Sequence, residues 1–442
     1  MRRLPFARAA CATIVVVLVG ACTSAPVPSV GSPSTQRPSA TPSVTTGTPS
    51  QAAPPTTGGP ELTARHVMIR LPAGGSFRVR GIYPWSPSRC AHQERTTLDG
   101  KYPGTLSIRT IGDGTLTLTV TLTFQRYLEG IAEVPPTWPA AALEAQAIAA
   151  RSYVLSTTGW TGAQGTHLAT PICGTSACQV YGGIPIPRPA GLRRWYRAVG
   201  DTTGEVLMYG GRPADTVYFS TSNGRTYGND EIFGSSPLPY LRPVVERDDG
   251  ASPLSRWRVA LPFRDLAPML IAAGSWPVGV PITSAAVVGS VVRLVGGGQT
   301  RAIDAGTLRD DVNTWGPCLM PRRYPSGGLP VAIPSGWFRL SAGSRGLMVD
   351  GRGWGHGVGM VQWGAYGKAA RGWSTSKILA FYYGGLRPQR YAEPGTLDVV
   401  VASGLRSMTV DPSRAGATVD GGRFDGTLRI VGGDEVTVTS PA

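Results

Sequence analysis

The chain has 442 residues, of which 41% are hydrophobic, and a formal net charge of +15. This length allows a sizeable core divided among two or three lobes. The charge does not indicate nucleic-acid binding, because the arginines are scattered and neither a basic helix nor an RNA-binding motif is present. We favour a solvated arginine-rich surface, and attraction to anionic envelope polymers is the alternative.

The N-terminus has the pattern of an export signal. Arg2, Arg3 and Arg8 flank an apolar run at residues 9–19, which is too short for a membrane-spanning helix of about 20 residues. The run ends in Val-Gly-Ala-Cys, which resembles a bacterial lipobox, where Cys22 receives a diacylglyceryl group. Two acyl chains would hold the protein to the outer face of a membrane. The alternative is an ordinary cleaved signal peptide (residues 1–22), and both interpretations predict export to the cell envelope.

Residues 23–60 consist mainly of Ser, Thr, Pro, Gly and Ala. A segment of this composition cannot bury a core, so we expect a disordered tether. Fully stretched, it would reach about 125 Å.

The folded part begins with strands and continues with a helix. Residues 61–125 alternate apolar and polar side chains, a period-two pattern typical of strands. Pro139 opens a helical pattern that continues to about Ser156, with Leu143 and Val154 on one face. We expect this helix to be buried on one side.

The second half predicts further elements and sets the domain limits. A short helix at residues 263–273 and strand-like runs, notably 282–295, indicate an inserted, mostly β lobe. Helical patterns resume at 359–371 and after Ser374, a plausible N-cap. The predicted fold class is α+β, a mixed sheet-and-helix catalytic core with an inserted β lobe and a small C-terminal β module. The predicted boundaries are residues 61–388 for the main domain and 389–442 for the C-terminal module. Within the main domain, the core covers about 115–245 and 345–388, and the inserted lobe covers about 246–344.

Four cysteines lie beyond the anchor, at positions 90, 173, 178 and 318. An even number in an oxidising compartment favours disulfides. Of three pairings, Cys173 with Cys178 and Cys90 with Cys318 is the simplest.

Residues 129–151 contain the candidate acid. Glu133 lies in a loop between a strand and the buried helix, and the two prolines that follow Val134 restrict its backbone. Desolvation among apolar side chains raises the pKa of a carboxyl and suits it to general acid catalysis. Arg151, on the same helix, could orient the carboxyl or bind substrate. The alternative is a loop glutamate paired with a structural arginine.

A second motif is the glycine-rich stretch GRGWGHGVGMVQWGAYG at residues 351–367. It is not a P-loop, since no Gly-Lys-Ser/Thr follows, and His356 has no HExxH partner. Rings with amide and imidazole groups are typical of sugar sites. The alternative is a tight turn before a helix.

Together these motifs resemble the stage II sporulation protein D (SpoIID/LytB) family. The resemblance extends over six blocks in the family's order, within residues 129–386. They are the acid loop with its helix (133–155), CQVYGG (178–183), YFSTSNGRT (218–226), PYLRPV (239–244), the glycine-rich stretch, and ILAFYYGG (378–385).

The resemblance implies a lytic transglycosylase that cuts peptidoglycan glycan strands, preferably strands without peptides. Glu133 would protonate the glycosidic oxygen and then accept the proton of the muramyl C6 hydroxyl, which closes onto C1. This chemistry requires neither a second carboxylate nor a cofactor. The residues implied to bind substrate are Arg151, Gln179, Ser220, Tyr240, Arg242, His356, Gln362, Tyr382 and Tyr383.

The chain departs from the family at a few positions. Val134, Val361 and Trp363 stand where Met, Ser and Tyr are common. Some members bind zinc near the CQVY block, and His167, Cys173 and Cys178 could hold a structural zinc ion here. Ala177 replaces a further expected histidine, so we favour a Cys173–Cys178 disulfide.

A second function stays open within the same family. Some members are described as enhancers of a cell-wall amidase, which would make this chain a glycan-binding module with an amidase partner. The presence of Glu133 favours the enzyme.

Overall fold

The computed structural model describes ten stretches of the chain. They are residues 61–71, 75–82, 97–131, 133–162, 165–175, 177–184, 190–320, 322–324, 333–413 and 416–440. The predicted signal peptide with Cys22, the tether, and Cys90 lie outside them. Within these stretches, no helix is long and apolar enough to cross a membrane.

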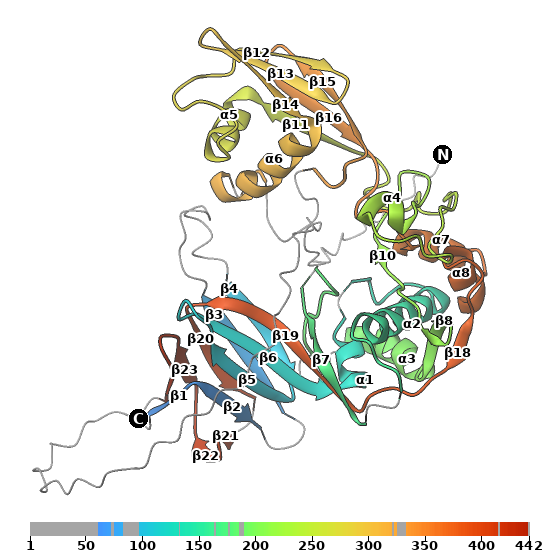
Figure 1. Cartoon of the computed structure of the whole chain (residues 1–442), viewed down its shortest axis with the longest axis vertical. Helices are drawn as coiled ribbons and strands as arrows, with labels where there is room; N and C mark the ends of the chain where they lie inside the picture. Colours follow the sequence, from blue (N-terminus) through green and yellow to red (C-terminus); the bar gives the residue numbers. More distant parts are fainter. Residues whose placement is uncertain are drawn as a thin grey trace, which may run out of the picture.

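The fold is α+β, as predicted. Figure 1 shows two sheets at the lower left, a group of helices around α2 at the lower right, and a lobe at the top. The sheets and most of α2 contribute to one hydrophobic core, whereas the lobe has a core of its own.

The two sheets combine strands from both ends of the chain. One has the order β1-β24-β23-β20-β3-β4 and the other β22-β21-β2-β5-β6-β19-β7. The early strands are β1 (Glu61–Ala64), β2 (His66–Arg70), β3 (Ser76–Ile82), β4 (Thr97–Pro103), β5 (Thr105–Thr110), β6 (Leu116–Thr123) and β7 (His167–Cys173). The late strands are β19 (Thr396–Leu405), β20 (Ser407–Pro412), β21 (Ala417–Val419), β22 (Gly422–Phe424), β23 (Leu428–Val431) and β24 (Val436–Thr439).

Residues 389–442 therefore do not form a sheet of their own, although they are strands, as expected. β19 pairs antiparallel with β6, where Val399 lies opposite Val120, and parallel with β7 on its other side. β20 pairs with β3. The sequence pattern identified these strands but not their partners, because strand pairing over about 300 residues leaves no local signal.

The helical region is organised around α2 (Ala140–Thr157). It also contains α1 (Phe124–Glu129), η2 (Ala190–Leu192), α3 (Arg193–Asp201), α4 (Asn229–Phe233), α7 (Gln362–Ala370), α8 (Thr375–Tyr382) and the strands β8 (Glu205–Tyr209), β9 (Arg212–Pro213), β10 (Tyr218–Phe219), β17 (Met360–Val361) and β18 (Pro388–Arg390). The Ser374 hydroxyl accepts from the Lys377 amide, which confirms the predicted N-cap.

The expectation that α2 is buried on one side is wrong. Every residue from 145 to 152 is buried, because α3, α7, α8 and β8 surround the helix. Five buried alanines of the helix allow neighbouring elements to approach closely. Those alanines are Ala142, Ala145, Ala147, Ala149 and Ala150.

In the described residues of the lobe there are two three-stranded sheets and two helices. One sheet has the order β11-β16-β15 and the other β12-β13-β14. The bounds are β11 (Trp257–Pro262), α5 (Phe263–Ala272), β12 (Ser284–Val288), β13 (Val291–Gly296), β14 (Gln299–Asp304), α6 (Ala305–Leu319), β15 (Phe338–Gly343) and β16 (Gly346–Gly351). The sequence pattern did not predict α6, because Gly306, Gly316 and Pro317 interrupt its helical pattern.

We predict that a chain ending at residue 388 will not fold cooperatively. The deletion removes β19 from between β6 and β7 and exposes the edges of both sheets. Thermal unfolding followed by circular dichroism should show a cooperative transition for the full chain and none for the sheet region of the truncated one. A soluble truncated protein with the melting temperature of the full chain would contradict this pairing scheme.

Candidate active site

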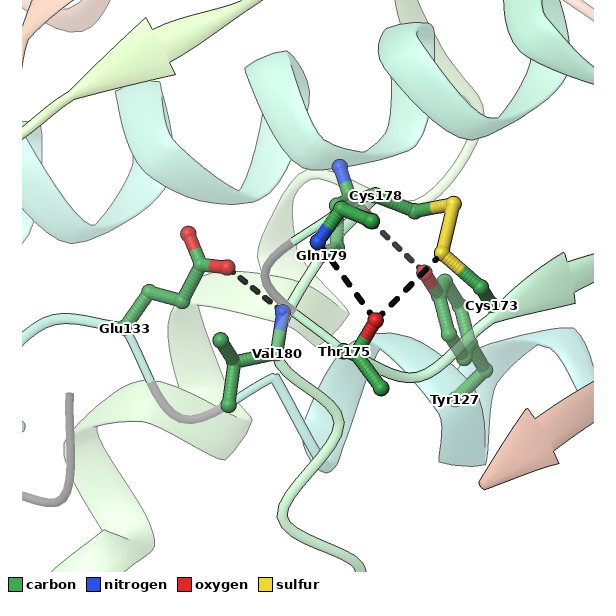
Figure 2. The surroundings of a disulfide bond; sticks show 8 residues. Tyr127, Glu133, Cys173, Thr175, Cys178, Gln179 and Val180 are labelled. Atoms are coloured by element: carbon green, nitrogen blue, oxygen red, sulfur yellow. Dashed lines mark hydrogen bonds between the residues drawn. A yellow bond between two sulfur atoms is a disulfide. The ribbon is translucent and has the colours of Figure 1, made fainter. Parts of the chain in front are cut away.

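Two loops meet at Glu133. The first follows α1 and leads into α2, and the second, residues 174–183, returns from β7. Bridges between Ile131 and Tyr181, and from the Gly182 amide to the Gly130 carbonyl (2.9 Å), hold the loops side by side. As a result, the amide of Val180 donates to Glu133 Oε1 at 2.6 Å (Figure 2).

The second loop is fixed by a disulfide and a buried amide. Cys173 and Cys178 are bonded, with Cα atoms 5.6 Å apart, as favoured from the sequence. Gln179 Nε2 donates to the Ala150 carbonyl (3.0 Å), and the Tyr127 hydroxyl donates to Gln179 Oε1 (2.8 Å). Figure 2 shows Gln179 and the disulfide on the side of the Val180 amide that faces away from Glu133. The donor to Glu133 is thus held by covalent and hydrogen bonds on both sides.

The carboxyl of Glu133 has the properties of a general acid. Although the residue as a whole is half-buried, burial of its carboxyl raises the pKa to about 7, against an ordinary value of 4.5. The Val180 amide and the Tyr218 hydroxyl favour the charged form and limit this rise. At neutral pH the group can therefore donate a proton and take one back.

Tyr218 is the second group at the acid. Burial, and then the Glu133 carboxylate, keep the pKa of Tyr218 well above its usual range, so it remains a proton donor. Its hydroxyl is buried and makes no hydrogen bond of good geometry within the part of the chain that the structure describes. A substrate oxygen or a small shift toward the carboxylate would supply the missing acceptor.

His356 holds the backbone of Tyr218. The Val358 amide donates to His356 Nδ1 (3.1 Å), so Nε2 carries the proton and donates to the Tyr218 carbonyl (2.9 Å). Burial lowers the pKa of His356 to about 4, which keeps the imidazole neutral at pH 7. His356 is therefore a positioning residue.

An aromatic cluster joins the acid loop to α7. Trp138, at the end of the loop, lies edge-on to Trp363 with ring centroids 4.9 Å apart, and Tyr366 contacts both rings. Trp363 and Tyr366 are half-buried. Half-buried rings that contact the end of the acid loop suit the stacking of pyranose rings.

The predicted role of Arg151 is wrong. Its side chain is fully buried, its guanidinium donates to the carbonyls of Val199 and Glu205, and it forms an ion pair with Glu393 (2.5 Å). It makes no contact with Glu133 among these bonds. A charge enclosed in this way stabilises the packing of α2 and cannot reach a substrate.

Five other residues predicted to bind substrate also have structural roles. The Tyr240 hydroxyl accepts from the Asp215 amide, the Tyr382 hydroxyl donates to Glu246, and the Tyr383 hydroxyl donates to the Val217 carbonyl. Gln362 donates to Gln146 across α2 (3.4 Å). The buried set is Gln179, Tyr240, Gln362, Tyr382 and Tyr383. Ser220 is half-buried beside Tyr218, and Arg242 is exposed.

The residues considered for zinc do not form a ligand set. Both sulfurs of Cys173 and Cys178 are in the disulfide, and His167 is bonded to Thr396 (2.9 Å). Across the described stretches, no three His, Cys, Asp or Glu side chains gather closely enough to hold a metal ion. Cys318 is also disulfide-bonded, and its predicted partner, Cys90, lies outside the described residues.

The sequence prediction missed two groups, the Val180 amide and Tyr218. A backbone donor carries no residue signature, so no pattern could identify Val180. Tyr218 opens the YFSTSNGRT block, in which Ser220 was selected instead. Tyr218 stands two residues before Ser220 in that block, and this closeness in sequence was the available signal.

Comparison with known proteins points to one family. The profile described as "Stage II sporulation protein" matches residues 112–209. An uncharacterized protein of Brachyspira hyodysenteriae is 30% identical over 299 residues, which cover 66% of this chain and 74% of the relative. The stage II sporulation protein D of Bacillus subtilis is 28% identical, covering 59% of this chain and 73% of the relative. The amidase enhancer of Bacillus subtilis is 27% identical, but the match covers 57% of this chain and only 38% of that protein.

We predict that Glu133→Gln stabilises the protein at pH 8 and not at pH 4. The stability that the protonated carboxyl contributes is fully present below about pH 4.5 and is lost as the pH rises through about 7, because burial raises the folded-state pKa. Glutamine stays neutral, so the variant should gain about 3 kcal/mol in unfolding free energy over wild type at pH 8. Urea unfolding at both pH values measures the difference.

Glu435→Gln is the matched control, because Glu435 is exposed on the surface. It should leave the unfolding free energy unchanged at either pH. An equal effect of Glu133→Gln at pH 4 and pH 8 would show that the carboxyl is not desolvated.

Proposed function

Because the chain belongs to the stage II sporulation protein D family, we propose that it is a peptidoglycan lytic transglycosylase of the cell envelope. The observation that carries this proposal is the desolvated carboxyl of Glu133, whose pKa of about 7 suits one group acting first as acid and then as base. No acidic side chain among the described residues contributes to that pKa. A single-carboxyl mechanism fits this arrangement.

The reaction has two proton transfers. Protonated Glu133 gives its proton to the glycosidic oxygen between N-acetylmuramic acid and N-acetylglucosamine, and the C1–O bond breaks. The resulting carboxylate then takes the proton of the muramyl C6 hydroxyl, whose oxygen bonds to C1 and forms a 1,6-anhydro ring. Water is not consumed, and the carboxyl ends in its starting state.

Neighbouring groups stabilise the carboxylate between the two steps. The Val180 amide donates to Oε1, and a hydrogen bond to an ionised acceptor is stronger than one to a neutral acceptor. Tyr218 can donate to the carboxylate or to the departing sugar oxygen. Trp363 and Tyr366 provide ring faces for the sugars. No cofactor is needed for either proton transfer.

A second candidate function is a glycan-binding partner of a cell-wall amidase. It is favoured by the similarity to the Bacillus subtilis amidase enhancer. The proposal of an enzyme rests on the desolvated carboxyl of Glu133, because a module that only binds glycan does not need a carboxyl with a raised pKa.

We predict that Glu133→Gln lowers the rate of glycan cleavage at least about a hundredfold, because general acid catalysis contributes on the order of 10² to 10⁴ in rate. The assay incubates full-length protein with peptide-free glycan strands and detects 1,6-anhydromuramyl ends by mass spectrometry. The wild-type kcat/KM should fall as the pH rises through about 7, where Glu133 loses its proton.

Glu435→Gln serves again as the matched control and should cleave at the wild-type rate. Equal product from Glu133→Gln and wild type would refute the catalytic assignment. If neither protein cleaves but both bind glycan and accelerate an added amidase, the partner function is the correct one.

We also propose that Cys22 carries a lipid anchor and that the tether confines cleavage to glycan near the membrane. Cys22→Ser should move the protein from the membrane fraction to the medium or periplasm, as measured by fractionation and immunoblotting. Ser24→Ala, two residues away, is the control and should remain at the membrane. Retention of the Cys22→Ser protein at the membrane would rule out this anchor.

A further inference from the structure

A pocket of about 940 Å³ lies at the root of the lobe, and Glu133 is not among its lining residues. Its walls are formed mainly by the ends of β11, β15 and β16, with Asn223 from the helical region. Its charged lining side chains are Arg256, Arg258, Arg339, Arg352 and Asp350, and Trp337 adds a ring on their side, whereas Trp257 and Phe338 alternate to the other face of the sheet.

Strand register gathers the four arginines on one face of this sheet. Arg258, Asp350 and Arg339 lie side by side in one row across the three strands. Two residues further along, Arg352 lies beside Trp337, whose carbonyl accepts its amide (3.0 Å), and Arg256, directly before β11, lines the same pocket. Residues two apart on a strand share a face about 7 Å apart.

The arginine face has an excess of positive charge. Arg258 pairs with Asp350 at 2.5 Å. Within the described ranges, Arg256, Arg339 and Arg352 have no ion-pair partner, and all three side chains are exposed. Like charges held on neighbouring positions repel one another, so an anion bound here would relieve this repulsion.

Rings and an amide complete the face. Trp337 stacks on Tyr227, with ring centroids 5.6 Å apart and planes within 11°, and remains half-buried. Asn223 donates to the Tyr227 hydroxyl (2.7 Å), while its Oδ1 has no donor among the residues that the structure describes. Exposed guanidinium groups for carboxylates and a half-buried indole ring beside them form one binding surface.

The face is fixed from behind and connected to the acid. On the opposite side of the sheet, Trp257 covers Gly351, where a Cβ atom would lie 2.1 Å from the indole ring. The segment that ends at Asn223 begins five residues earlier at Tyr218, so the Cα atoms of these two residues are at most about 18 Å apart, a separation that one glycan strand can span.

We propose that this arginine face binds a carboxylate-bearing glycan segment at a distance from the point of cleavage. The inference rests on the proposed function, because the muramyl lactyl carboxylate becomes free only when the stem peptide is removed. Guanidinium groups then bind the free carboxylates, whereas an amide-linked peptide removes that charge from the sugar. The face thus provides a physical basis for selecting peptide-free strands.

The test measures binding without cleavage, in full-length Glu133→Gln protein. In this background, the triple variant Arg256→Gln, Arg339→Gln and Arg352→Gln should bind peptide-free glycan at least about tenfold more weakly by calorimetry. The matched control, Arg293→Gln, Arg301→Gln and Arg345→Gln, removes the same charge from exposed positions elsewhere in the lobe. It should bind within about twofold of its parent.

A chemical control tests the carboxylates themselves. Strands whose lactyl carboxyls have been converted to methylamides should bind the Glu133→Gln parent as weakly as native strands bind the triple variant. The triple variant should bind methylamide strands and native strands with equal affinity. Unchanged binding by the triple variant, or equal binding of native and methylamide strands, would overturn the proposal. Displacement of glycan by poly(glycerol phosphate) at lower concentration would assign the face to a phosphate polymer instead.

The outcome is separable from that of the proposed function. Binding is measured in a protein that lacks the acid. The result therefore tests the arginine face even if the wild-type protein releases no anhydromuramyl ends. If wild type cleaves and the triple variant binds like its control, the enzyme proposal survives and the arginine face does not.

Discussion

The burial of α2 on all sides is the constraint on which the site depends. The Ala149 carbonyl accepts from Thr216 (2.8 Å), and the Ala150 carbonyl accepts from Gln179 (3.0 Å). Thr216 is two residues from Tyr218, and Gln179 precedes Val180. One turn of a single helix thereby places both groups that contact Glu133, and the buried guanidinium of Arg151 keeps that turn in register with α3 and β8.

A second buried charge fixes the path of the chain toward the lobe. Lys368 Nζ bonds to Glu246 (2.9 Å) and Asp248 (2.8 Å), and it lies 4.2 Å from the centre of the Phe381 ring. Breaking such a pair leaves an uncompensated buried charge, at a cost of about 3–5 kcal/mol. Since β11 begins nine residues after Asp248, this network holds the base from which the lobe extends.

Sequence patterns predicted what is local and missed what is not. The Ser374 cap, the extent of α2 and the Cys173–Cys178 disulfide depend on neighbours in sequence, and each was predicted. The pairing of β19 with β6 and the burial of the middle of α2 on all sides depend on residues 50 to 280 positions away. Polar residues in motif blocks were taken to contact substrate, yet Arg151 and Tyr382 bond to the protein itself, because a buried polar side chain must find partners wherever it occurs.

The acid and the arginine face place different demands on one polymer. At Glu133 the muramyl residue to be cleaved enters a desolvated environment, so its own lactyl carboxylate must point away from an acid that has to stay protonated. At the lobe root the same kind of carboxylate is attracted by exposed guanidinium groups in water-accessible surroundings. Segment 218–223 joins the two environments through Tyr218 and Asn223, so strand binding at one position restricts where the bond to be cleaved lies at the other. Charge recognition at a distance can thus set the register of a strand, while cleavage depends on the desolvated carboxyl of Glu133.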